Sequence, residues 1–431
     1  MSGFGKMRGR PLFALLLVVL LGLTAAACGG GDSDTTATEE TATTTEETGG
    51  EEGGGATITP TPAAESASYL FEDRELGGGY RPGGVGDDAL TEKSIKAGEE
   101  AGEEVEPAKL PSGTIGVINF LNGIESSDRL ADTVTYGAAE LGWDTIVCDG
   151  KGTPSQFIAC GNSLLAQGVA AIVDIAVEPG AIQPVLNKAK QQGVPVVQAG
   201  GGGVPTGDLS GNYGPDEALA GELLTEAIFE ELEPLEGNPE IVVHNFPAKW
   251  GAERTEQLEK AVSEQDKIKI ADNVTTDAAD LVPYTERTVN TQITQYPDAK
   301  AYWFTFDTTG QVGGGVISSK YPGKEFPEKP LVGTFHGDLS TLGLMAQGDI
   351  DVISEVNYDM ASLIALDGIA KELAREEQMP QEIQPEFPVI GQPLTYAVVT
   401  AENLPPEGEY VPTEWDVPAY FVSKWRTEYG L

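Results

Sequence analysis

The stretch TIGVINFLNGIESSDRLADTVTYGAAELGWD, Thr114–Asp144, predicts a strand, a loop and a helix. Thr114–Phe120 is almost continuously apolar at its centre, which suits a strand buried on both faces of a parallel sheet. Along Ser127–Leu141 the apolar residues recur every three or four positions and therefore share one helical face. Because open α/β sheets bind ligands beyond the carboxyl ends of their strands, the loop Leu121–Ser127 is the first candidate part of a binding site.

The same strand–helix unit repeats along the chain to about residue 399. Strands are expected to alternate with helices, and Pro154, Gly168 and Gly193 stand where helices begin or stop. A second series of strands and helices begins after Asn212. This alternation is typical of α/β folds with doubly wound parallel sheets. The Pro-rich and aromatic stretch Glu402–Leu431 is expected to be irregular and to pack as a strap.

The N-terminal residues have the pattern of an export signal. Basic residues precede the apolar run Leu12–Leu23, which is shorter than a membrane-spanning helix. Small residues then lead to Cys28, an arrangement that resembles a bacterial lipobox, although Ala25 replaces the usual Leu. We expect a lipoprotein signal peptide over residues 1–27 and lipid attachment at Cys28, which would anchor the protein to the outer face of the cell membrane. An ordinary secretory signal is the alternative.

The segment after Cys28 is acidic and poor in apolar residues. Gly29–Ala64 consists mainly of Thr, Glu and Gly and cannot bury a core, so residues 28–112 are expected to form the lipidated cysteine and a flexible tether. One acidic helix is expected over Leu90–Glu104. The net charge of −42 makes nucleic acid and anionic membrane surfaces poor partners.

Two further cysteines could form a disulfide. Cys148 ends a predicted strand, and Cys160 falls in the second turn of the next helix. Export permits disulfides, and a bridge over so short a loop would contribute roughly 2–3 kcal/mol. Two buried free thiols are an equal alternative. Neither cysteine has a nearby His, so nucleophilic catalysis is not indicated.

The sequence offers no motif for metal binding or for common enzyme chemistry. His244 and His336 are the only histidines and have no carboxylate cluster at metal-ligand spacing. There is no GxSxG elbow and no Walker loop. We therefore expect no metal, no cofactor and no enzymatic activity.

Several fragments carry a family resemblance. LAQGVAAIV at Leu165–Val173 and AKQQGVPVV at Ala189–Val197 are the most specific, and GNYGPDEALAGELL at Gly211–Leu224 and LVGTFHGD at Leu331–Asp338 add to them. From Thr114 to about Asn403 the chain resembles the bacterial periplasmic sugar-binding proteins of the ribose- and galactose-binding type. These proteins deliver solutes to ABC importers.

The resemblance implies two α/β lobes, joined by a three-crossover hinge, that close on a ligand. Lobe 1 would comprise residues 113–212, completed by about 357–390. Lobe 2 would comprise 213–356, completed by about 391–404, with a C-terminal strap over 405–431. The implied partners are a small solute and ABC permease subunits, and the implied state is a monomer. A sensor that docks on a membrane receptor is the rival function.

The cleft departs from the family pattern. The ring-stacking aromatic pair falls on Ser126 and Ser127, and the Asp-Arg pair falls on Gly200 and Gly201. Glycines there suggest a wider cleft with accessible backbone amides. Because these hydroxyl-binding groups are replaced, we expect a sugar or sugar-like ligand that is not a simple pentose such as ribose. The remaining family positions carry Ala252 near Arg254, Phe306 before Asp307, His336 near Asp338, and Glu355.

Aromatic residues are expected to replace the lost polar contacts. The candidates are Phe120, Phe246, Trp250 and Phe306, and for each taken alone core packing is the simpler interpretation. Trp250 is the strongest candidate because it lies in a predicted strand-to-helix loop aimed at the cleft. Tyr213 and Tyr358 are candidates for the hinge or the ligand. The expected ligand contacts are Phe120, Asn122, Glu125, Ser126, Gly200, Asn212, Phe246, Trp250, Arg254, Asp307, His336, Asp338, Glu355 and Asn357.

Overall fold

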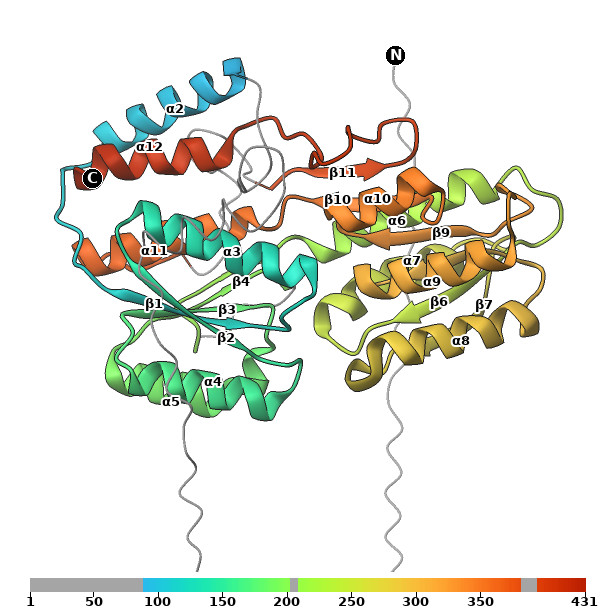
Figure 1. Cartoon of the computed structure of the whole chain (residues 1–431), viewed down its shortest axis with the longest axis horizontal. Helices are drawn as coiled ribbons and strands as arrows, with labels where there is room; N and C mark the ends of the chain where they lie inside the picture. The colour runs from blue at the N-terminus through green and yellow to red at the C-terminus, as the bar shows by residue number, and fades with distance from the viewer. Residues whose placement is uncertain (1–87, 202–207, 381–393) are drawn as a thin grey trace, which may run out of the picture. The chain divides into compact units, whose positions relative to one another are not determined.

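The computed structural model describes residues 88–201, 208–380 and 394–431 (Figure 1). The predicted signal peptide, Cys28 and the Gly29–Ala64 segment lie outside these residues. Within the described ranges no helix is long and apolar enough to cross a membrane.

The first sheet forms lobe 1. Its strand order is β2-β1-β3-β4-β5 and every pairing is parallel. The interior strand β1 is buried along almost its whole length, as its apolar sequence predicts. The strands are β1 Thr114–Asn119, β2 Asp144–Asp149, β3 Ala171–Ile175, β4 Val196–Ala199 and β5 Gly211–Tyr213.

Helices cover both faces of this sheet (Figure 1). One face packs against α3, Glu125–Glu140, and α11, Met360–Arg375. The other packs against α4, Pro154–Ala166, and α5, Gln183–Gln192, which follows the short helix η1, Pro179–Ile182.

Helix α3 begins earlier than its sequence pattern predicts. The expected loop Leu121–Ser127 ends at Ile124, so Ser126 and Ser127 belong to the first helical turn. The Asp128 carboxylate accepts a hydrogen bond from the Gly123 N–H, which closes the turn before the helix. Acidic residues in the first turn also favour an early start because they complement the helix dipole.

The second sheet forms lobe 2 in the order β11-β10-β9-β8-β6-β7. Only the edge strand β11 is antiparallel to its neighbour among the described strands of this sheet. The strands are β6 Glu240–Asn245, β7 Lys269–Thr275, β8 Ala299–Phe304, β9 Leu331–Phe335, β10 Val352–Val356 and β11 Tyr396–Val399. The two-lobe α/β prediction is confirmed.

The second sheet is also covered on both faces. Helices α6, Glu217–Leu232, and α7, Lys249–Ser263, pack on one side. The other side carries α8, Leu281–Gln295, α9, Asp307–Lys320, and α10, Leu339–Gln347. A short helix η2, Ala278–Asp280, precedes α8.

The chain crosses between the lobes after β5, after β10 and between α11 and β11, which are the three crossovers of the expected hinge. Its C-terminal residues then return to lobe 1. The expectation of an irregular tail is wrong, because its last part forms helix α12, Val417–Tyr429. Pro418 stands at the start of this helix and Asp416 caps it, accepting a hydrogen bond from the Ala419 N–H at 3.0 Å.

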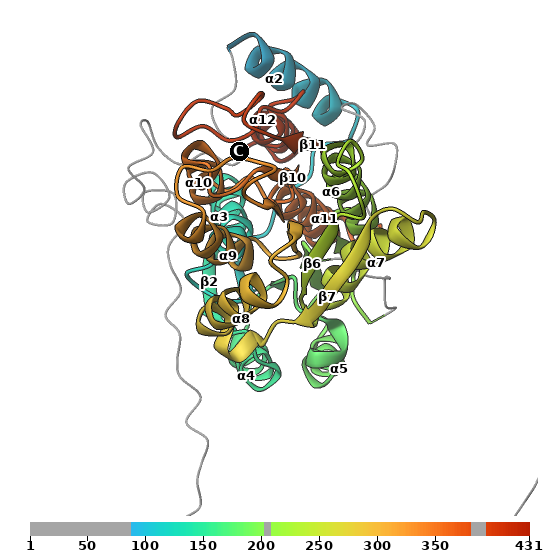
Figure 2. The ribbon, with the colours of Figure 1, turned by 90° about the vertical axis from the view of Figure 1, so that its right-hand side faces the viewer.

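Helix α12 packs against α2, Asp88–Glu103, and the two lie side by side (Figures 1 and 2). The acidic helix predicted over Leu90–Glu104 is thus confirmed, so this part of the segment expected to be a flexible tether is folded. Gly98 permits the close approach, because a Cβ there would lie 2.1 Å from the Ser423 Oγ and 2.2 Å from the Tyr420 carbonyl oxygen.

A buried ion network fixes α12 on lobe 1. The Lys424 Nζ contacts Asp367 and donates to Glu428 Oε2 at 2.8 Å. Trp425 Nε1 donates to Asp367 Oδ1 at 2.9 Å. Burial opposes ionisation of Asp367, but Lys424 and Lys371 outweigh it and hold the pKa of this carboxyl below its usual range.

Cys148 and Cys160 form a disulfide, which decides between the two alternatives left by the sequence. Strand β2 and the second turn of α4 bring their Cα atoms to 5.6 Å.

Candidate functional site

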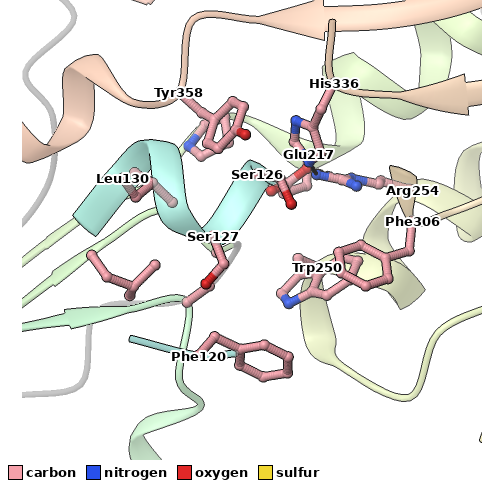
Figure 3. A pocket seen from close by; sticks show the side chains of 14 residues that line it. Phe120, Ser126, Ser127, Leu130, Glu217, Trp250, Arg254, Phe306, His336 and Tyr358 are labelled. Carbon is pink, nitrogen blue, oxygen red and sulfur yellow. Dashed lines mark hydrogen bonds and ion pairs between the residues drawn. The ribbon is translucent and has the colours of Figure 1, made fainter. Parts of the chain in front are cut away.

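A pocket lies between the lobes, where residues follow the carboxyl ends of strands in both sheets (Figure 3). Lobe 1 contributes residues after β1, β3 and β4 and from the start of α3, whereas lobe 2 contributes residues from α6 and α7 and after β8 and β9. The lining residues are Phe120, Ser126, Ser127, Leu130, Ile175, Ala176, Gly201, Pro215, Glu217, Trp250, Arg254, Phe306, His336 and Tyr358.

Aromatic rings of lobe 2 form one wall of the pocket. Trp250 stacks on Phe246 with ring centroids 4.9 Å apart, and Phe306 lies 5.5 Å from Trp250. From lobe 1, the Phe120 ring reaches to 6.5 Å from Phe246. These contacts join the lobes through apolar surface, which is the main source of favourable burial energy.

Arg254 is buried at the upper edge of this wall (Figure 3). Its guanidinium donates to Glu217 Oε2 at 2.5 Å, to the Thr305 carbonyl at 2.8 Å and to His336 Nε2 at 3.1 Å. Burial raises the pKa of Glu217, and the charge of Arg254 partly offsets this. The arginine therefore organises the pocket from within lobe 2, with three of its donor groups already bound to protein.

The contact with Arg254 fixes the protonation of His336. Arginine can only donate, so His336 Nε2 must accept and the proton of the neutral ring lies on Nδ1. Burial, together with the positive charges of Arg254 and Arg129, lowers the pKa of His336 well below its usual value.

Two residues that line the pocket, His336 and Ala176, have a left-handed backbone conformation, with φ of 65° and 55°. Backbone strain of this kind is common at ligand sites.

A second buried arginine joins the lobes behind the pocket. Arg129 of α3 lies near the rings of Tyr358 and Tyr410, at 4.8 and 4.5 Å. Burial raises the pKa of its neighbour Glu355 to about 7, and Arg129 opposes the shift. Three carboxylates surround the guanidinium, those of Asp338 at 2.8 Å, Asp359 at 3.0 Å and Glu355 at 3.6 Å.

Two buried carboxyl groups of lobe 2, Asp307 and Asp338, lie close enough for their charges to interact. Burial raises the pKa of both, and because adjacent carboxylates repel, the pair favours one shared proton. Asp307 Oδ1 accepts a hydrogen bond from the Thr308 N–H at 2.6 Å.

Carboxylates of lobe 1 also reach the helix ends of lobe 2. Glu125 accepts from the backbone N–H groups of Leu339 and Ser340, at the start of α10. Glu178 accepts from the Lys249 N–H, at the start of α7, at 2.9 Å. Each carboxylate satisfies helix N-terminal donors that would otherwise need water.

The structure brings five of the predicted contact residues into the pocket lining: Phe120, Ser126, Trp250, Arg254 and His336. Two others contact lining residues from behind, Phe246 through the Trp250 ring and Asp338 through the Tyr358 hydroxyl. Asp307 accepts from the Thr308 N–H, and Glu355 accepts from the Gly337 N–H. Asn122 accepts from Asn119 Nδ2, Asn212 lies in β5, and Asn357 accepts from the Thr395 N–H. Ligand contact stays a prediction for all of them.

The glycines after β4 do not widen the cleft as expected. A Cβ on Gly200 would lie 2.6 Å from Leu130 Cδ1, so Leu130 fills the space beside it. The Gly200 N–H donates to the Tyr213 carbonyl at 2.9 Å and is not accessible. Gly201, with φ of 75°, is the glycine that lines the pocket.

Sequence reasoning missed Arg129 and Glu217. Arg129 stands beside Leu130 on a helix whose apolar face was recognised, but its partners lie more than 200 residues away, at 209 and 230 positions. Glu217 follows the predicted helix start, where a carboxylate usually serves the helix dipole. Within the described part of the chain, no group of three or more His, Cys, Asp or Glu side chains could hold a metal ion.

The periplasmic binding protein domain matches residues 115–371 of this 431-residue chain, which is more than half of it. The chain therefore belongs to the periplasmic binding protein family, whose members are solute-binding proteins rather than enzymes. A search of curated proteins gives no match.

Solved structures share the fold at low sequence identity. An ABC transporter solute-binding protein from Agrobacterium vitis with bound allitol is 18% identical, with a TM-score of 0.59 over 69% of this chain and 98% of that one. A Burkholderia graminis solute-binding protein in complex with D-arabinose is 21% identical, with a TM-score of 0.58 over 70% and 99%. A Mycobacterium smegmatis protein in complex with β-D-fucofuranose is 17% identical, with a TM-score of 0.57 over 67% and 91%.

Proposed function

We propose that this protein captures a small solute, a sugar or sugar-like molecule, between its lobes and delivers it to an ABC importer. The observation that carries the proposal is the pocket itself, because its lining comes from both lobes. A ligand that contacts both lobes only when they are closed favours the closed form by its differential affinity. The permease subunits would then recognise the closed protein, which acts as a monomer.

The cell-surface part of the proposal rests on the N-terminal sequence. Cys28 follows an apolar run and small residues, so we propose that it is lipidated and anchors the protein outside the cell membrane. The acidic segment after it would keep the lobes at a distance from the membrane. Fractionation of cells that express Cys28→Ser tests this: the variant is expected in the soluble extracytoplasmic fraction, and retention in the membrane would contradict the anchor.

Delivery to an importer is tested by uptake. Cells that lack the gene should lose high-affinity uptake of the ligand, and the wild-type gene should restore it, whereas a Trp250→Ala gene should not. Normal uptake in the deletion strain, together with a lost transcriptional response to the ligand, would favour the sensor instead.

A calorimetric titration with ribose tests the expected ligand class. Submicromolar binding of ribose would contradict the expectation that the ligand is not a simple pentose.

A further inference from the structure

Two hydrogen-bond donors in the pocket lining have no partner among the described residues. Trp250 is 6% exposed and His336 is 7% exposed, and both residues line the pocket. Trp250 Nε1 and His336 Nδ1 find no hydrogen-bond partner among the described residues. Both are donors, the indole by its chemistry and the imidazole because its Nε2 accepts from Arg254.

Both donors belong to side chains that line the pocket (Figure 3). Figure 3 shows the Trp250 nitrogen turned toward the region between Ser127 and Phe120. One nitrogen of His336 faces Arg254 and the other faces the side on which Tyr358 lies. Buried donors that lack a partner are rare, because each forfeits its bond with water on folding. A ligand with acceptor atoms would satisfy both.

Three of the lining side chains that could accept a proton from a ligand, Ser127, Glu217 and Tyr358, are already engaged. Ser127 Oγ donates to Asn119 Oδ1 at 2.6 Å and accepts from the Leu121 N–H at 3.4 Å. Glu217 Oε2 is ion-paired with Arg254, and the Tyr358 hydroxyl donates to Asp338 Oδ1 at 3.1 Å. Each hydroxyl of a sugar brings a proton that needs an acceptor, and leaving one buried without a partner costs about ten- to a hundredfold in affinity.

The rest of the lining is apolar on both lobes. Phe120, Leu130 and Ile175 come from lobe 1, and Trp250 and Phe306 come from lobe 2. Apolar walls with a few fixed polar groups suit a ligand with apolar faces and polar atoms at its edge.

We propose that the ligand is a compact ring compound with largely apolar faces and hydrogen-bond acceptors at its edge, which accept from Trp250 Nε1 and His336 Nδ1. A heteroaromatic ring that carries a carbonyl group has this chemistry, and a fully hydroxylated sugar does not. The inference rests on solute capture between the lobes, as proposed above, and replaces the sugar-like ligand class with rings that carry few hydroxyl groups.

A thermal-shift comparison of two probe sets tests the ligand class on the mature protein. The first set is nicotinamide, benzamide and uracil, and the second is D-ribose, D-galactose and allitol, all at equal concentration. We expect at least one member of the first set to raise the melting temperature and no member of the second to do so. A shift with the sugars alone overturns the ligand class but leaves solute capture standing. No shift with either set overturns the ligand class, and solute capture is then decided separately by uptake.

Variants test the two donors with the best ring compound. Trp250→Phe keeps an aromatic ring but removes the N–H, and it should weaken binding about tenfold or more. Trp303→Phe is the matched control, because Trp303 Nε1 also lacks a partner among the described residues but lies in the lobe 2 core. His336→Asn should largely retain binding, because Asn offers an N–H donor and tolerates the φ of 65°. Equal affinity of Trp250→Phe and Trp303→Phe would overturn the proposal.

Discussion

Glu125 in lobe 1 accepts a hydrogen bond from the backbone N–H of Ser340 in lobe 2 at 3.1 Å, and its Oε2 also accepts from the Ser340 hydroxyl at 2.5 Å. Glu125, which the sequence predicts to contact ligand, thus caps the N-terminus of helix α10 in the opposite lobe. The contact exists only while the lobes are together, so it stabilises the closed arrangement independently of any ligand. Closure then depends on this cap as well as on the solute.

Replacing Glu125 with Gln should shift the ligand-free protein toward the open form. Gln keeps the size of the side chain but loses the charge that favours a helix N-terminus, a loss of about 0.5–2 kcal/mol. The radius of gyration from small-angle X-ray scattering should increase. Glu140→Gln is the matched control, since Glu140 lies on the same helix but pairs with Arg426. Identical scattering of the two variants would contradict a role for Glu125 in closure.

Glu178 should act on the same equilibrium through a different helix. Its carboxylate accepts from the Lys249 N–H at the start of α7, so Glu178→Gln should also favour opening. Because the two caps serve separate helices, their free-energy effects should add in the double variant Glu125→Gln/Glu178→Gln. The scattering profile should show a further rise in the open fraction. A double variant no more open than either single one would show that only one cap limits closure.

Lys424 should be essential for the docking of α12. Lys424→Met leaves Asp367 and Glu428 buried without their shared cation, and breaking such a network costs about 3–5 kcal/mol. Urea unfolding should show this loss in the free energy of unfolding. Lys96→Met on α2 serves as the control, because its pair with Glu100 is exposed and should contribute little. A loss under about 1 kcal/mol for Lys424→Met would contradict the structural role of the network.

The stability of lobe 2 should fall in acid through His244. Burial lowers the pKa of His244 to about 4, although the hydrogen bond with Gln292 opposes the shift. Between pH 6.5 and 4 the unfolded state therefore binds more protons, so stability is complete above pH 6.5 and falls as the pH drops toward 4. The full contribution is about 3 kcal/mol.

His244→Gln removes this titration and keeps a donor toward Gln292. The free energy of unfolding of the variant should change less between pH 7 and pH 4.5 than that of the wild type, measured by urea unfolding at both values. Other buried acids titrate in both proteins and cancel in the comparison. Parallel pH profiles of the two proteins would show that His244 is not the group responsible.

Local sequence patterns predicted most of the fold because the bounds of helices and strands depend mainly on residues that are close in the sequence. The periodic helix after β1 and the Pro and Gly boundaries placed most elements within a few residues of their observed ends. Helix α12 was missed because the Pro-rich segment before it dominated the pattern. Tyr420, Phe421 and Trp425 nevertheless share one helical face, and Asp416 is a good cap.

The site was less predictable because it depends on distant partners. Trp250 could be selected from its place in a strand-to-helix loop. The hydrogen bonds from Arg254 to Glu217 and His336, by contrast, form only when α6, α7 and the loop after β9 come together in the fold. The effect of Gly200 was misjudged for the same reason, since Leu130 from another element fills the space that a missing side chain leaves.

The measurement that tests solute capture most directly is a thermal-shift screen of the mature protein against a broad library of sugars, polyols, nucleosides, heterocycles and small acids. A ligand at 100 times its dissociation constant should add about 2.7 kcal/mol to the wild type and to Trp303→Phe. The same ligand should leave the melting temperature of Trp250→Ala unchanged. If no compound stabilises the wild type, or if Trp250→Ala responds equally, the interlobe pocket is not the solute site.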